Sequence, residues 1–287
     1  MSFRKRRRKL EESVFKVLMY SAVGIVLVSL GGILLTVCIK GIPGLSWEMI
    51  SKPAEGGFYL GKGGGILNAI IGSIYLAGGA VLLAFALSII AALFLRVTGS
   101  RRRGLCSLIR FTLDVLTGVP SIVYGAFGFT LMLALRMRAS LLGGIITVAI
   151  LILPIMIRAM DEAFNGIPEE LLDASYSLGA NRTETAFRVV LRQAVPGIVT
   201  AVLISFGRAI GDAASVIFTA GFSDNIPTSL SKPAATLPLA IFFQLGTPYP
   251  EVRMKGYTSA FVLTVIILAV SIAARLLGRR LSRNVIS

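Results

Sequence analysis

An arginine and an aspartate stand four residues apart in an otherwise apolar stretch. They are Arg208 and Asp212 in the segment 198–220, and in a helix this spacing puts both on one face. A charge at the centre of a bilayer costs roughly 2.5–3.5 kcal/mol, so such residues usually face a protein interior, a partner or an aqueous path. The planar guanidinium of Arg208 can donate two hydrogen bonds to a phosphate, a sulfate or a carboxylate, and Asp212 can orient it. The pair is therefore a candidate substrate path for an anion.

The same pair also has a purely structural interpretation. The two charges would then neutralise each other and fix the packing of helices. Gly207 and Gly211 form a small-xxx-small pattern that lets two helices approach closely. Pro120 and Pro154, in two other apolar segments, predict kinks that are either hinges or plain irregularities of packing.

Residues for catalysis or for a metal are not found in the sequence. The chain has no His and two Cys; Cys38 and Cys106 fall at the ends of different apolar segments, so we expect neither a disulfide nor a zinc site. Residues 56–63 approach the phosphate-binding P-loop pattern, but they lack the Ser or Thr that binds magnesium. We expect no catalytic residue, no metal, no cofactor bound by this chain and no ATP hydrolysis of its own.

The elements that must position Arg208 and Asp212 are membrane helices. Hydrophobic residues make up 55% of the 287 residues and charged residues 15%, against about 25% charged in soluble domains. Six apolar segments approach or exceed the roughly 20 residues that cross a hydrocarbon core, and they lack the alternation of barrel strands. These segments are 17–39, 67–95, 109–135, 141–157, 198–220 and 258–277. The sequence predicts an all-α, polytopic membrane protein of about six transmembrane helices rather than a soluble enzyme.

The distribution of basic residues predicts the orientation. Of the 29 Lys and Arg residues, 20 fall in segments that would be cytoplasmic and 8 in segments that would be outside, with Arg208 inside a span. Both termini are therefore expected in the cytoplasm of a multi-pass protein of the cell membrane. The net charge of +15 thus indicates contact with the lipid bilayer rather than with nucleic acid. The segment 17–39 is too long for a signal peptide, and we interpret it as a retained first span.

These segments divide the chain into four parts. We expect a basic cytoplasmic N-terminal segment at 1–16, a first transmembrane helix with an outer loop at 17–62, a core transmembrane domain at 63–279 and a cytoplasmic tail at 280–287. Within the core, 160–197 is predicted as a cytoplasmic loop. The proline-rich segment 221–257 is predicted as an irregular outer loop, re-entrant near 237–245.

The cytoplasmic loop predicts two short helices joined by a tight turn. Pro168 suits the first position of a helix, Gly179 suits a C-terminal cap, and Asn181 with Glu184 can form a capping box. One apolar face is then expected from Phe187, Val190, Leu191 and Ala194. Such a hairpin either covers the bundle as an ordinary surface element or lies in the groove of a partner.

The loop resembles the EAA loop of ABC-importer permeases. Asp173, Ala174 and Ser175 stand where that family has Glu-Ala-Ala, Gly179 matches its glycine, and residues 189–192 stand where it has Ile-x-Leu-Pro. Asp for Glu, Ser for Ala and Arg for Pro are departures that keep the spacing. The resemblance implies a loop that docks onto a separate ATPase and transmits its closure. The coupling residues would be Asp173, Ala174, Ser175, Gly179, Phe187 and Leu191.

Four further blocks, at 63–73, 114–125, 153–158 and 207–212, are similar to the PstA-type permeases of phosphate importers. This resemblance implies an ABC type I importer fold with inorganic phosphate as cargo. It also implies a second homologous permease subunit, ATP-binding cassette ATPase subunits (two of them) and an extracytoplasmic phosphate-binding protein as partners. In that family an arginine of the last block is associated with the phosphate path, and Glu is usual where Asp212 stands.

Other functions stay open from the residues alone. The cargo could be sulfate, molybdate or another oxyanion, since Arg208 suits each of them. A self-sufficient secondary transporter or channel usually has internal repeats, and none is clear in this sequence. A membrane-embedded enzyme would need a catalytic constellation, which the sequence does not offer.

Overall fold

The computed structural model describes residues 2–55, 63–98 and 102–282. All but the last residue of the P-loop-like segment 56–63 lies outside the described residues. In chain order the elements are α1 (Ser2–Gly41), the 3-10 helix η1 (Ile42–Gly44), α2 (Trp47–Ser51), β1 (Ala54–Glu55), β2 (Gly63–Gly64), α3 (Leu67–Thr98), α4 (Arg103–Thr117), α5 (Ser121–Ala134), α6 (Leu141–Asn165), α7 (Glu169–Ser177), α8 (Arg182–Thr185), the π-helix η2 (Ala186–Val190), α9 (Leu191–Gln193), α10 (Val195–Gly211), α11 (Leu237–Leu245) and α12 (Pro250–Ser282).

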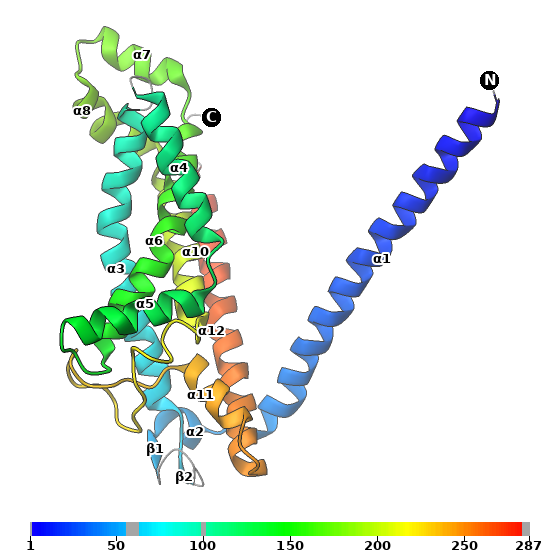
Figure 1. The fold of residues 1–287 in the computed structure, drawn as a ribbon, viewed down its shortest axis with the longest axis vertical. Coiled ribbons are helices and arrows are strands. Elements are labelled where there is room, and N and C mark those ends of the chain that lie inside the picture. Colours follow the sequence, from blue (N-terminus) through cyan, green and yellow to red (C-terminus); the bar gives the residue numbers. More distant parts are fainter. Residues whose placement is uncertain (1, 56–62, 99–101, 283–287) are drawn as a thin grey trace.

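Most of the long helices in the described residues form a bundle along one axis (Figure 1). Helices α7 and α8 lie at one end of the bundle, which we name the hairpin end. Helix α2 and the short antiparallel pair of β1 and β2 lie at the other, the loop end. Among the helices of the described residues, four are long and apolar enough to cross a membrane. The number of spans rises to as many as six if each of two bent helix pairs is one span. The prediction of an all-α fold with about six spans is confirmed.

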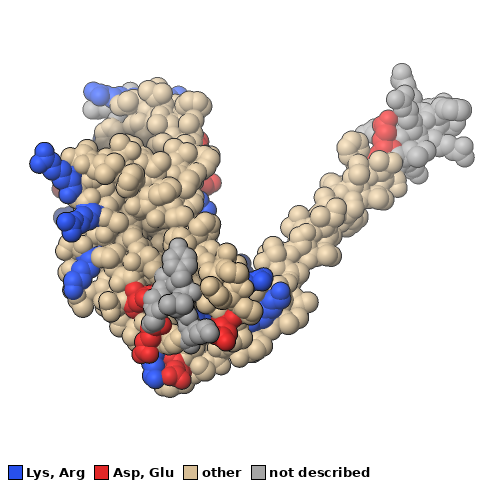
Figure 2. Space-filling view, turned by 60° about the horizontal axis from the view of Figure 1, so that its bottom comes forward, with Lys and Arg blue, Asp and Glu red and all other residues tan. Residues whose placement is uncertain are grey.

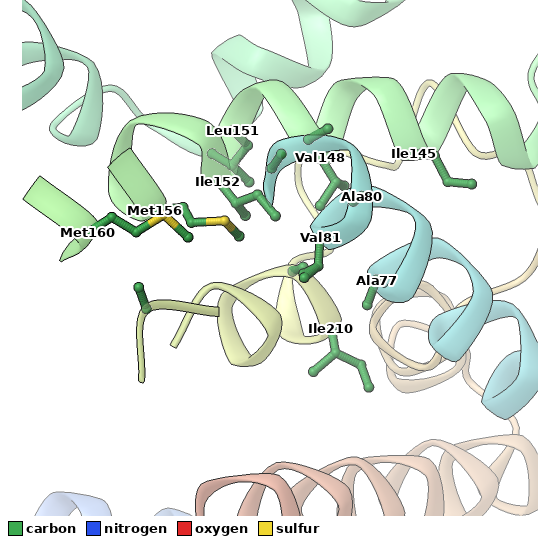
Figure 3. Close-up of a cluster of buried hydrophobic side chains, with 14 of the residues drawn as sticks. Ala77, Ala80, Val81, Ile145, Val148, Leu151, Ile152, Met156, Met160 and Ile210 are labelled. Atoms are coloured by element: carbon green, nitrogen blue, oxygen red, sulfur yellow. The ribbon is translucent and has the colours of Figure 1, made fainter. Parts of the chain in front are cut away.

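Helix α6 is the centre of the bundle. Its most apolar stretch is 67% buried, against 39% for α3 and 0% for α1 and α12. Val148, Ile152 and Met156, spaced by four residues, are fully buried. In Figure 3 side chains of this helix point toward residues of α3 and toward Ile210 of α10. The helix continues to Asn165, beyond the predicted end at residue 157, and it runs through the buried Pro154 without a break.

The third predicted span is broken, so the prediction of one helix over 109–135 is wrong. Helices α4 and α5 meet at an angle of 99°, and α5 lies across the bundle while α4 runs along it (Figure 1). Pro120 lacks an N–H and disfavours helical geometry at the residue before it, and it stands directly before α5. The Tyr124 hydroxyl donates to the Leu116 carbonyl across the break, at 2.9 Å, which holds the bend.

The fifth predicted span also differs from the prediction of a helix over 198–220. Helix α10 begins at Val195, after a 70° bend that follows α9, and ends at Gly211. Asp212 is extended, with φ −87° and ψ 123°, and residues 213–220 form turns. Hydropathy alone misses this end because residues 213–220 are as apolar as the helix before them.

The segment after these turns is anchored to α3. Its short element is helix α11, which occupies the segment predicted as re-entrant. The Leu237 N–H donates to Ser73 Oγ of α3 at 2.8 Å. A Cβ on Gly72 of α3 would collide with the carbonyl oxygen of Ala235. Only a glycine lets α3 approach this backbone so closely.

Helix α1 leaves the bundle. It contacts α12 near its C-terminal end, where the Thr258 hydroxyl donates to the Gly41 carbonyl at 3.0 Å. From there it projects away as a single rod (Figure 1). Between its charged end and its base the rod is almost wholly uncharged (Figure 2). The described chain therefore leaves the apolar sides of α1 uncovered.

An ion network that the sequence analysis missed ties α4 to α6. The guanidinium of Arg110 donates to both oxygens of Asp161, at 2.8 and 2.9 Å. Arg158 donates to Asp161 at 3.3 Å and to Asp114 at 2.7 Å. The side chain of Asp161 is 0% exposed, and these two arginines are its hydrogen-bond partners. The network fixes α4 against α6 on the hairpin side of the break at Pro120.

The first prediction concerns the close approach of α3 to residue 235. Gly72→Val should lower the free energy of unfolding by at least about 1–3 kcal/mol, the usual cost of overpacking. The new side chain would press against backbone atoms that cannot move aside. Gly78→Val, on the same helix but with nothing within 4 Å of its Cβ position, should stay within about 1 kcal/mol of the native chain. The thermal unfolding midpoint of both purified variants in detergent measures the difference. Equal losses would contradict the packing described here.

The second prediction concerns the buried carboxylate. Asp161→Asn should cost about 3–5 kcal/mol of stability, because two arginines lose a buried partner. Asp114→Asn should cost under about 1 kcal/mol, since the Asp114 side chain is 55% exposed. Unfolding curves of the two variants test this. A smaller loss for Asp161→Asn than for Asp114→Asn would show that the network does not hold α4.

Candidate functional site

The arginine and aspartate singled out in the sequence lie together at the end of α10. An Arg208 Nη atom is 3.7 Å from Asp212 Oδ1, and their side chains are 48% and 6% exposed. This distance makes an ion pair but not a hydrogen bond. Arg208 stands in the last turn of α10, where a positive charge complements the helix dipole. Its guanidinium has no hydrogen bond within the described chain, so its donors can serve a further acceptor.

The two charged residues have different surroundings. Asp212 is buried, and its Oδ2 accepts a hydrogen bond from the Ser215 N–H at 2.8 Å. This bond holds the first turn after α10, so Asp212 shapes the chain where the helix stops. The hydroxyl of Ser215 is buried and has no partner among the described residues. The structural interpretation therefore fits Asp212, and the anion-binding interpretation fits Arg208.

The two glycines of this segment do not bring two helices of this chain together. A Cβ at Gly207 would meet nothing within 4 Å, and one at Gly211 would meet only Ile267, at 3.8 Å. Gly207 lines a cavity of about 750 Å³ between α10 and α12. We name this cavity the α10–α12 groove. It is lined by Thr200, Leu203, Ile204, Gly207, Ser271, Ala274, Arg275 and Gly278.

The broken third span lies against the same region. A Cβ on Gly125 of α5 would lie 2.8 Å from the carbonyl oxygen of Ala214 and 3.0 Å from that of Ser215. The bend at Pro120 thus lays α5 on the turns that follow Asp212. Pro154, the other predicted hinge, lies inside the unbroken α6. The structure brings the region of Pro120 to the candidate site and leaves Pro154 in the core.

The predicted hairpin forms at the hairpin end. Gly179 has φ +85°, a conformation that glycine adopts readily. Its N–H donates to Tyr176 O at 2.9 Å, and the Ala180 N–H donates to Ser175 O at 3.2 Å. These two bonds are a Schellman cap, and Gly179 ends α7 as predicted. Asn181 and Glu184 form the predicted capping box of α8.

The proposed coupling residues are divided between surface and interior. Asp173 and Ala174 are exposed on α7. Ser175 is half-buried, and its Oγ lies 2.9 Å from Thr185 Oγ1, which joins α7 to α8. Leu191 is half-buried against the core. The exposed residues leave α7 a surface that the rest of the described chain does not cover.

The predicted apolar face of the second helix is wrong at one position. Phe187 is 56% exposed, whereas Val190 and Ala194 are buried as expected, together with Ala186. Residues 186–190 form a π-helical turn, which inserts an extra residue per turn. The turn rotates Phe187 outward and gives its expected place to Ala186. Phe187 and Leu178, which is 89% exposed, are then two large apolar side chains on the surface of the hairpin.

One helix connects the hairpin to the charged pair. α9, the last part of the hairpin, is followed directly by α10, and Arg208 lies in the last turn of α10. α7 and α8 lie at the hairpin end, while the far end of α10 points toward α5 (Figure 1). The two candidate sites of the sequence analysis are therefore joined by consecutive helices, with a 70° bend between α9 and α10.

Comparison with known sequences places the chain in a family. Residues 84–286 match the family described as "Binding-protein-dependent transport system inner membrane component". The chain is 32% identical over 269 residues to the "Phosphate transport system permease protein PstA" of Pasteurella multocida, covering 94% of this chain and 95% of that protein. It is 30% identical to the protein of the same name from Haemophilus influenzae, with 94% of each covered.

Solved structures show the same fold. The methionine ABC transporter MetNI in inward-facing conformations matches with a TM-score of 0.62 and 18% identity, over 75% of this chain and 95% of that one. A bacterial alginate ABC transporter, solved with an alginate-bound periplasmic protein, matches with a TM-score of 0.65 and 12% identity, over 98% of this chain and 99% of that one. With these likenesses in sequence and in fold, the chain belongs to the family of inner membrane components of binding-protein-dependent transport systems.

Proposed function

We propose that this chain is the PstA-type permease subunit of an ATP-driven importer of inorganic phosphate. The observation that carries the proposal is the alignment of almost the whole chain with permeases named for phosphate transport. The chain would be a transport subunit and not an enzyme, and ATP would be hydrolysed by partner subunits. No cofactor is needed for this role.

Arg208 is the group that would meet the anion. Its guanidinium is half-exposed and paired with Asp212 only at 3.7 Å. An arginine in this state can donate two parallel hydrogen bonds to a phosphate without first losing one of its own. The neighbouring turns give the anion a non-helical surface next to this charge, and α5 packs on those turns. Asp212 would hold the end of α10 and so fix where Arg208 stands.

The hairpin would dock onto the ATPase. Its exposed surface carries Asp173 and Ala174 with the apolar Leu178 and Phe187. An amphipathic helix with such anchors is suited to a groove of a partner. Movement of the ATPase would reach Arg208 because α9 leads directly into α10. In this arrangement the coupling residues are Asp173, Ala174, Ser175, Gly179, Phe187 and Leu191.

A second permease chain would complete the path. Two surfaces of this chain support such a partner: the uncovered apolar sides of α1 and the α10–α12 groove, whose glycines and small side chains leave room for another helix. Gly207 and Gly211 would then serve packing between chains rather than within one.

The loop end would face the extracytoplasmic phosphate-binding protein. Figure 2, which views the molecule with this end brought forward, shows acidic and basic side chains gathered there. Such mixed charges suit a transient, electrostatically guided contact. The N-terminal end of α1 and the C-terminal end of α12 both lie toward the hairpin end (Figure 1). This placement supports both termini in the cytoplasm, on the same side as the ATPase.

Labelled-phosphate uptake tests the proposal most directly. Cells without their own phosphate importer would receive the partner subunits with or without this chain. We expect uptake only with the chain present, and we expect it to persist in excess sulfate. Uptake that sulfate abolishes would favour the alternative of another oxyanion, and uptake without the chain would overturn the proposal.

The third prediction concerns Arg208. Arg208→Ala should reduce phosphate uptake at least ten-fold, about 1.4 kcal/mol in the barrier, while the complex still assembles. Arg208→Lys should retain part of the uptake, because it keeps the charge but loses the two-pronged donor. Uptake and co-purification of the partner subunits are measured together. Normal uptake in Arg208→Ala would exclude Arg208 from the path, and failed assembly would favour a packing role.

The fourth prediction concerns Gly179. Gly179→Leu should uncouple transport from ATP hydrolysis, since a left-handed conformation costs a residue with a side chain roughly 1–2 kcal/mol and the turn would open. Gly179→Asn should keep coupling, because Asn tolerates this conformation. The ATPase rate of the reconstituted complex, with and without loaded binding protein, distinguishes the two. Equal stimulation in both variants would remove the turn from the coupling mechanism.

A further inference from the structure

A second group of arginines lines a cavity at the hairpin end, away from Arg208. The cavity has a volume of about 490 Å³ and lies between the end of α3, the start of α4 and helix α7. It is lined by Leu95, Arg96, Val97, Arg103, Cys106, Arg110, Asn165, Glu169, Leu172, Asp173, Tyr176 and Arg182. We name it the α3–α4–α7 cavity. Four of its residues are arginines: Arg96 of α3, Arg103 and Arg110 of the next helix α4, and Arg182 of α8, which is distant in the sequence.

The four arginines differ in the hydrogen bonds and ion pairs that they already form within the protein. Arg110 is held by the buried Asp161. Arg182 reaches the Val97 carbonyl at 3.4 Å. Arg96 donates one Nη–H to the Ile167 carbonyl at 3.3 Å, and its buried Nε has no partner among the described residues. Arg103 is exposed and forms no ion pair within the described chain. The cavity therefore holds guanidinium donors that the fold itself does not use.

The start of α4 adds to this positive surface. Arg103 is the first residue of α4, and no side chain caps that end of the helix. The first N–H groups of a helix carry a partial positive charge and favour anions. Asn165 and Tyr176 line the same cavity and supply neutral donors. An oxyanion in the cavity would be met by donors from several elements.

Two carboxylates in the cavity limit which anions can bind there. Glu169 and Asp173 line it beside the arginines. A fully deprotonated anion such as sulfate can only be repelled by them. Inorganic phosphate keeps at least one proton at neutral pH, because its last proton is lost only in strong alkali, and it can donate this proton in a hydrogen bond to a carboxylate. The lining thus favours hydrogen phosphate over sulfate.

We propose that the α3–α4–α7 cavity binds inorganic phosphate on the hairpin side of the protein and thereby restrains helix α7. Residues of α7 form one wall and residues of α3 and α4 form the others, so a bound anion bridges the hairpin to the bundle. This regulatory part rests on the proposed function, in which α7 engages the ATPase and the hairpin end is cytoplasmic. Imported phosphate would then slow the importer from inside the cell.

Equilibrium dialysis tests the site without requiring transport. The probe is radiolabelled inorganic phosphate, and the sample is the permease assembled with its partner subunits, without ATP and without binding protein. The Arg208→Ala background removes the proposed path site. We expect this complex to bind phosphate in the presence of excess sulfate. Adding Arg103→Gln should weaken the binding at least ten-fold, and adding Arg102→Gln, a neighbouring exposed arginine that does not line the cavity, should leave it unchanged.

Three results would overturn the proposal. The first is that the Arg208→Ala complex binds no phosphate, and the second is that Arg103→Gln and Arg102→Gln have equal effects. The third is that added phosphatidylglycerol abolishes phosphate binding, which would assign the cavity to a lipid headgroup. Because dialysis does not depend on uptake, absent binding with normal uptake counts against this site alone, and absent uptake counts against the proposed function.

The regulatory part has its own measurement. Phosphate enclosed on the ATPase side of proteoliposomes should lower the ATPase rate stimulated by loaded binding protein. Arg103→Gln should raise the half-inhibitory phosphate concentration at least ten-fold, while its rate without enclosed phosphate equals that of Arg102→Gln. An unchanged half-inhibitory concentration would overturn the regulatory role.

Discussion

Close packing around α6 determines where the other membrane helices stand. Its buried residues recur at every fourth position, from Val148 through Ile152 to Met156, and α3 and α10 pack against them (Figure 3). α4 is held to the same helix by the Arg110–Asp161 pair as well as by apolar contacts. In a bilayer, apolar side chains alone give little preference for one helix neighbour over lipid. Close packing and the ion network around the buried Asp161 therefore supply the specificity of the bundle.

The irregular segments are tolerated because protein groups satisfy their backbone. Residues 213–220 leave the helical pattern within an apolar segment, and unpaired N–H and C=O groups in a hydrocarbon core would be costly. Asp212 accepts from the Ser215 N–H. Ser140 N–H donates to the Thr219 carbonyl, and Ala234 N–H to the Ala220 carbonyl. The turns next to Arg208 are thus built into the protein rather than left exposed to lipid, which allows a polar surface beside the charge.

Much of the fold could be predicted from apolar segment length, and the local features of the hairpin from individual residues. Gly179, Asn181 and Glu184 act within a few residues of themselves, so their roles follow from local chemistry. The end of α10 at Gly211 could not be predicted, because hydropathy measures apolar content and not backbone direction. The outward rotation of Phe187 also escaped prediction, since it depends on a π-helical turn that no local residue type specifies.

The candidate site was predictable only in part for the same reason. The spacing of Arg208 and Asp212 indicates that they share a face, but it does not show that one is buried and the other half-exposed. That difference comes from Ser215 and from where the helix ends. Arg110 pairs with Asp161, which lies on a distant segment of the chain. Arg182 likewise lines one cavity together with Arg96 and Arg103, although it is distant from them in the sequence. Contacts of this kind depend on the tertiary fold, which one sequence does not reveal.

The direct passage from α9 into α10 has a mechanical consequence. Helix α10 has 17 residues and so a length of about 26 Å. If the hairpin tilts this stiff rod by about 10° around its start at Val195, simple geometry moves Arg208, about 20 Å along the helix, by roughly 3–4 Å. Such a stroke is comparable to the diameter of a small oxyanion. Under the proposed function, a modest rotation of the hairpin would thus move the positive charge of Arg208 by a distance similar to the size of the anion.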